Sequence, residues 1–117
     1  MTTSSPTASA AGELSRERDR VVQRLRSMAL DAVPADRVLD AAQRLADLAA
    51  EAEPDARSAA RRTVPALAPY AAGDQVAVLT GEVLGLAETL EPAGAHRLLT
   101  AATAVLAELR LDLSAPR

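Results

Sequence analysis

The chain has 117 residues, the size of a single domain, with a net charge of −3, 25% charged residues and 49% hydrophobic residues. That balance is typical of a globular protein and not of a disordered one. The sequence has no Cys, Trp, Phe, Lys, Ile or Asn, and it has one His and one Tyr. Composition therefore says more about architecture than about activity.

These absences exclude several classes of functional site. Without Cys there is no thiolate nucleophile or Cys-ligated metal, and without Lys there is no Schiff-base amine or Walker-type phosphate ligand. His96 alone cannot form the multi-His site of a catalytic zinc, and no nucleophile elbow surrounds any Ser. The net negative charge and the lack of aromatic stacking platforms argue against nucleic-acid binding. We expect no catalytic residue, no cofactor and no metal.

Residues 1–12 are small and polar without periodicity, so we expect a disordered lead-in there and a disordered tail at residues 114–117. The lead-in has neither the basic nor the apolar region of a signal peptide. No apolar run approaches the ~20 residues of a membrane span. We therefore expect a cytoplasmic protein with no membrane partner, and Arg in place of Lys is typical of a GC-rich bacterial source.

Residues 13–113 have the pattern of one all-α domain, an antiparallel bundle of four to five helices joined by short Pro or Gly turns. The first-turn residues that mark helix starts are Pro34, Pro54, Pro92 and the pair Gly73-Asp74. The predicted helices cover residues 13–33, 35–52, 55–64, 74–90 and 93–112. No alternation of β-branched residues predicts a strand.

The first two predicted helices are amphipathic. In helix 35–52, Val38 and Leu45 lie on an apolar stripe opposite Asp40 and Arg44, and we interpret the charged side as solvated surface. In helix 13–33, Arg18 falls within the apolar stripe. We expect it either to extend past the core to solvent or to meet a carboxylate from another helix.

The last two predicted helices are apolar on two sides, which makes them either the bundle centre or a subunit interface. A glycine inside a helix costs about 1 kcal/mol relative to Ala, so a pair of glycines four residues apart indicates a groove for close helix packing. The candidate interface residues behind the two core stripes are Ala77, Val78, Gly81, Gly85, Thr103, Ala104 and Ala107. Residues 16–62 hold ten Arg and nine acids, whereas residues 63–117 hold three Arg and six acids, which fits a dimer formed through the less charged half.

The favoured hypothesis is a non-enzymatic interaction or oligomerisation module, either a homodimer or the small partner of a larger protein. The alternative is a small enzyme that acts by electrostatic stabilisation, with Arg18 opposite Arg57 or Arg61 and with Glu82 or Glu88 as partner. A helical bundle with several Arg in its first helix loosely resembles the all-helical chorismate mutases, and that resemblance implies such electrostatic catalysis.

Three further features of the sequence can be interpreted. A nucleic-acid regulator would use the ladder of Arg16, Arg20 and Arg24, but acidic residues, among them Glu17, share that side of the helix, so no nucleic-acid partner is expected. His96 is expected to be a partly exposed surface residue. Tyr70, beside a proline at a turn, is expected to plug the end of the bundle.

Overall fold

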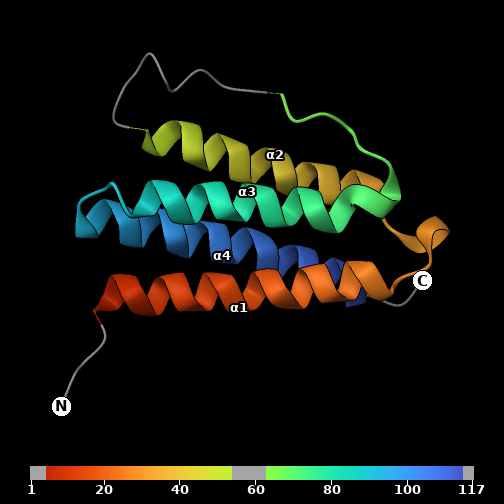
Figure 1. Cartoon of the computed structure of the whole chain (residues 1–117), viewed down its shortest axis with the longest axis horizontal. Coiled ribbons are helices and arrows are strands. Elements are labelled where there is room, and N and C mark those ends of the chain that lie inside the picture. The colour runs from red at the N-terminus through yellow and green to blue at the C-terminus, as the bar shows by residue number, and fades with distance from the viewer. Residues whose placement is uncertain (1–4, 54–62, 115–117) are drawn as a thin grey trace.

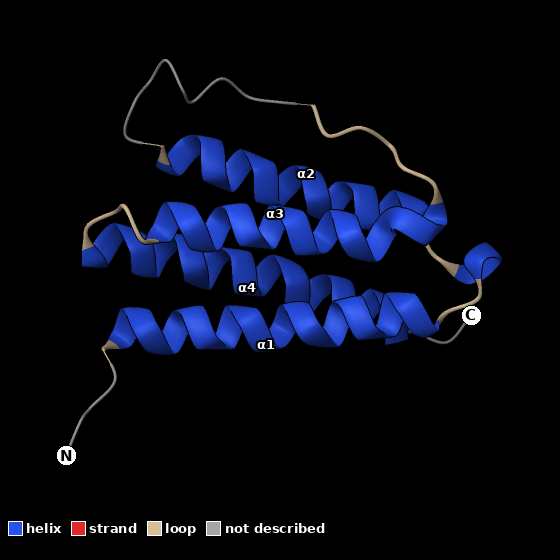
Figure 2. Cartoon of the chain, viewed as in Figure 1, coloured by secondary structure: helices blue, strands red, loops and turns tan. Residues whose placement is uncertain are grey.

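The computed structural model describes residues 5–53 and 63–114, and this part of the chain forms a helical bundle (Figures 1 and 2). Its four long helices are α1 (Pro6–Ser27), α2 (Ala35–Ala52), α3 (Ala72–Ala87) and α4 (Pro92–Ser114). Two short 3-10 turns, η1 (Leu30–Ala32) and η2 (Pro69–Ala71), come before α2 and α3. The predicted all-α, single-bundle architecture is confirmed.

Helices α3 and α4 occupy the middle of a flat molecule whose principal extents are 43 × 41 × 18 Å (Figure 1). Helices α1 and α2 lie at the two edges, and each packs against both middle helices, while α3 also packs against α4. Because α1 and α2 cover the flanks of both middle helices, the open side of α3 and the open side of α4 point in opposite directions.

The core is almost wholly aliphatic, built from Ala, Leu and Val of all four helices. Its largest fully buried side chains are Leu14, Leu45, Leu99, Leu106 and Leu109. Among residues 5–53 and 63–114, the buried polar side chains are Glu17, Gln75 and Thr80. Many small side chains allow the helices to approach closely, so stability depends on numerous modest contacts.

Helix α1 begins earlier than predicted, and the expectation of disorder is wrong for residues 6–12. Ser5 caps the helix, because its Oγ accepts a hydrogen bond of 3.0 Å from the Ala8 N–H, and Pro6 stands at the first helical position. Ala10 is buried in the core, so this first turn also gains packing energy. Residues 1–4 of the predicted lead-in lie outside the described residues.

Helix α1 also ends earlier than predicted. The Ser27 hydroxyl donates to the Arg24 carbonyl at 2.8 Å, and the next residue, Met28, is extended. Val33 is extended too, as is usual for a residue before proline, so the helix cannot continue into Pro34. By contrast, the predicted helix 35–52 is confirmed as α2.

The remaining predicted boundaries shift by a few residues. Residues 55–62 of the third predicted helix lie outside the described residues, and residues 63 and 64 are not helical. Helix α3 begins before residue 74, the predicted start, because η2 leads directly into it. It ends at Ala87, before the predicted end at residue 90, because a hydrogen-bonded turn follows. Helix α4 includes Ser114, the first residue of the predicted tail, whose other residues are not described.

Candidate interaction surface

The outward side of α3 carries small and apolar residues beside the exposed Glu82, and we call Val78, Gly81 and Gly85 the α3 face. Val78 is 61% exposed. Both glycines are exposed, and a Cβ atom built on either would meet nothing within 4 Å. They therefore do not serve close packing inside the bundle, so the bundle-centre explanation is wrong for them. Ala77 is half-buried at the edge of this face next to α1.

An apolar groove of about 310 Å³ extends the α3 face on its other side, between α3 and the segment 63–67. Two amide side chains fix that segment. The Gln43 Oε1 atom accepts a hydrogen bond of 2.8 Å from the Val64 N–H, and the Gln75 Nε2 donates to the Pro65 carbonyl at 2.9 Å. The lining, which includes Val64, Pro65, Leu67 and Val78, is therefore held in place by α2 and α3.

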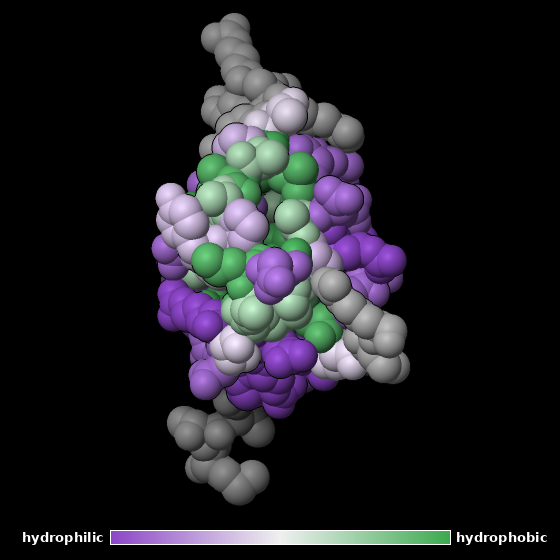
Figure 3. Space-filling view, turned by 90° about the vertical axis from the view of Figure 1, so that its right-hand side faces the viewer, coloured by the Kyte–Doolittle hydropathy of each residue, from purple (hydrophilic) through white to green (hydrophobic). Residues whose placement is uncertain are grey.

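Large apolar side chains are also exposed at the end of the bundle where η1 and η2 pack together. Leu30 is 59% exposed, Leu67 is 46% exposed and Tyr70 is 78% exposed. The prediction that Tyr70 plugs the bundle is therefore wrong. Figure 3 looks at this end and shows mostly hydrophobic residues at its centre, one hydrophilic residue among them, and hydrophilic residues around them.

Leu67 joins the two apolar regions. It lines the groove beside Val78, and it also lines a small cavity of about 70 Å³ together with Val33 and Pro69. Leu67 thus lines both the groove beside the α3 face and the cavity at the end of the bundle. A contiguous exposed apolar surface with a polar rim is typical of a binding surface.

The candidate residues on α4 lie on the opposite side of the molecule. Ala104 is exposed, while Thr103 and Ala107 are half-buried, and the Thr103 hydroxyl donates to the Leu99 carbonyl at 2.8 Å. Ion pairs border this side of α4 on both flanks, with Arg110–Glu17 towards α1 and Arg44–Glu108 and Arg37–Asp112 towards α2. The structure therefore separates the seven predicted interface residues into two surfaces.

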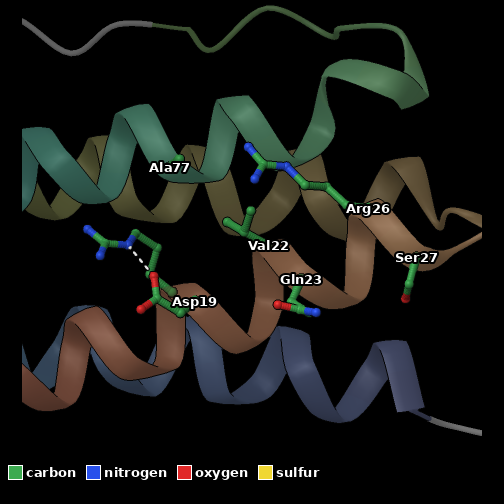
Figure 4. A pocket seen from close by; sticks show the side chains of 7 residues that line it. Asp19, Val22, Gln23, Arg26, Ser27 and Ala77 are labelled. Atoms are coloured by element: carbon green, nitrogen blue, oxygen red, sulfur yellow. Dashed lines mark hydrogen bonds and ion pairs between the residues drawn. The ribbon is translucent and has the colours of Figure 1, made fainter.

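A second, open groove of about 650 Å³ runs between α1 and α3, with Val22 and Ala77 on facing helices (Figure 4). Arg18 and Arg26 both line it. The Arg18 Nε atom lies 3.1 Å from Asp19 Oδ1, so Arg18 meets the carboxylate of its sequence neighbour and not one from another helix. The Arg26 Nη2 atom lies 3.1 Å from Asp74 Oδ1 at the start of α3.

The residues proposed for electrostatic catalysis do not form a buried cluster among the described residues. Arg18 lines the open groove, and both Glu82 on α3 and Glu88 at the C-terminal cap of α3 are exposed. Arg57 and Arg61 lie outside the described residues. Within residues 5–53 and 63–114, no group of three or more His, Asp or Glu side chains could hold a metal ion. No helix of the same residues is both long enough and apolar enough to cross a membrane.

Glu17 is the polar residue that sequence analysis placed wrongly, on the solvent side with the arginine ladder. It is buried between α1 and α4, where it pairs with Arg110 and, at 3.3 Å, with Arg20. Its position three residues after Leu14 and four before Val21 could have revealed this, because those spacings place it on the apolar stripe.

The other two residues of the arginine ladder, and His96, lie at the surface. Arg24 donates to the Leu113 carbonyl at 3.3 Å, so this side chain ties α1 to the end of α4. Arg16 is exposed, and His96 is exposed as well.

No family model, no curated protein and no solved structure matches the chain. Its function is therefore argued from its own surfaces.

Proposed function

We propose that the chain is a non-enzymatic interaction module that binds other protein surfaces through the apolar side formed by the α3 face, the groove and the bundle end. The observation that carries this proposal is the exposure of Leu30, Leu67, Tyr70 and Val78, with Leu67 lining both the groove beside Val78 and the cavity at the bundle end.

Physical chemistry favours a protein partner for such a surface. Leaving apolar area in water costs about 25 cal/mol per Å², and Tyr combines a large contact area with few rotatable bonds. The two short turns and the bonded segment 63–67 present these side chains on a fixed backbone, so little conformational entropy is lost on binding. Such a surface supports binding without catalytic groups.

The decisive experiment removes apolar area from the surface without touching the core. We expect Leu67→Ser combined with Tyr70→Ser to abolish association, because both side chains are exposed and contribute little to folding. Leu111→Ser is the matched control, since Leu111 is 63% exposed but lies on α4. Sedimentation over a concentration series measures self-association, and affinity capture from a cell lysate compares the proteins retained by each variant.

Association or capture that is lost in the double variant and kept by Leu111→Ser would support the proposal. A chain that stays monomeric and retains the same proteins in all three forms would overturn it.

A further inference from the structure

We propose that the α3 face docks against the α3 face of a second copy of this chain, with the two helices antiparallel and Gly81 on the two-fold axis. This inference rests on the proposed interaction function and names one partner for it. We choose a second copy of the chain as the partner because of the shape of the α3 face and the distribution of charge along it.

The α3 face has a shape that lets a partner helix pack closely against it. Ala77, Gly81 and Gly85 recur every four residues, so they form one row along the helix with Gly81 at its centre. The glycines lack side chains that would hold a partner away, and their Cβ positions face open space. Val78, beside this row, supplies exposed apolar surface and leads into the groove.

The charge at the C-terminal end of α3 lacks a counter-charge. Glu88 caps this end, no basic residue lies in the last turn, and Glu88 forms no salt bridge within the described part of the chain. A carboxylate there lies against the negative end of the helix dipole, which is unfavourable unless a cation is close. The face therefore accepts a positively charged group at this end.

The opposite end of the same face supplies that group. Arg26 reaches across the first turn of α3 and pairs with Asp74 through Nη2, and its side chain is 65% exposed, so further N–H donors are available. Asp74 and Glu88 are each seven residues from Gly81, about 10 Å along the helix. A two-fold axis at Gly81 consequently brings Glu88 of each copy to the Arg26–Asp74 pair of the other.

The symmetry makes the contact self-complementary. In an antiparallel pair of helices each charged contact occurs twice, and the C-terminal half of one α3 lies beside the groove of the other. Such an interface is closed, so it produces a dimer and not a filament.

Because the chain lacks Cys, single cysteines can map this contact directly. Gly81→Cys places the two thiols on the axis, and we expect it to form a disulfide-linked dimer under mild oxidation. Gly85→Cys alone should not cross-link, because its two copies would lie about 12 Å apart, but it should cross-link when mixed with Ala77→Cys. Ala104→Cys, exposed on α4, is the matched control and should stay uncrosslinked.

A charge exchange tests the same geometry without a covalent bond. Arg26→Glu and Glu88→Arg should each weaken dimerisation about tenfold, because each places like charges opposite one another. Mixing the two variants should restore a dimer of native affinity, since both contacts in the mixed pair are again between opposite charges. Sedimentation equilibrium measures the dissociation constants.

Self-cross-linking at Gly81 and recovery on mixing would support the proposal. Cross-linking at Ala104 but not at Gly81, self-cross-linking at Gly85, or no recovery on mixing would overturn it. If association is lost in the Leu67 and Tyr70 double variant while Gly81→Cys never cross-links, the interaction function stands and this dimer geometry fails.

Discussion

Thr80 stands in the middle of α3 with its side chain fully buried, and its hydroxyl has no hydrogen-bond partner among the described residues. A buried hydroxyl without a partner loses the hydrogen bonds that water would provide. Thr103 on α4 differs, because its hydroxyl donates to the carbonyl four residues earlier. The two threonines thus form a natural comparison.

We expect Thr80→Val to stabilise the fold by about 1 kcal/mol, because Val has nearly the same shape and removes the unpaired hydroxyl. Urea unfolding should show a higher midpoint with an unchanged slope. Thr103→Val should give no comparable gain, since it removes a hydrogen bond that is made. Equal shifts in the two variants, or a loss of stability at Thr80, would contradict the interpretation.

Glu17, which pairs with Arg110 and Arg20, is the most buried carboxylate in the ion pairs of the described residues. Replacing Arg110 by Met keeps the aliphatic packing but leaves the buried carboxylate with Arg20 alone, so we expect a loss of about 2 kcal/mol. Adding Glu17→Gln should recover part of that loss, because the neutral amide costs less to bury. The double-mutant cycle in urea measures the coupling.

The exposed pair Arg44–Glu108 is the control for this cycle. Arg44→Met should change stability by less than about 0.5 kcal/mol, because water screens exposed charges. A loss as large as that of Arg110→Met would show that burial of the carboxylate is not the cause.

Within helix α3, two exposed interior glycines, Gly81 and Gly85, weaken the helix. A Cβ at either position has open space, so Gly81→Ala and Gly85→Ala should each stabilise the isolated chain by about 0.5–1 kcal/mol. The measurement is thermal or urea unfolding at low protein concentration, where association does not contribute. If either variant loses stability in dilute protein, the added Cβ atom meets neighbouring atoms, and the space beside the two glycines is not open.

Helix α2 was predicted residue for residue because prolines stand at both of its limits and its charged and apolar stripes are separate. Helix α1 was misplaced at both ends for physical reasons. Residues 6–12 contain several alanines, which favour a helix but have no charged face to reveal its period. The helix ends at Ser27, where the hydroxyl donates to the Arg24 carbonyl. Hydrophobic periodicity does not predict such a local hydrogen bond, so it did not predict this end.

For the molecule as a whole, the sequence places Val78, Gly81 and Gly85 behind the core stripe of α3, and all three are exposed there. The sequence does not place them relative to the α4 candidates, because the periodicity of one helix does not show how two helices are oriented about each other. Only the arrangement of all four helices shows that the α3 and α4 candidates are on opposite sides. Leu30 and Tyr70 lie in 3-10 turns, where no period exists to reveal their exposure.

The pairing of α1 with α4 has a consequence for how the chain reaches its fold. These helices are farthest apart in the sequence, yet they share the most extensive contact in the bundle, and the Glu17–Arg110 and Arg24–Leu113 bonds span 93 and 89 residues. Closing so long a loop is entropically costly and comes late in folding. During synthesis, α1 emerges first but receives its main partner last, so its apolar stripe stays open until the final turns of α4 are made.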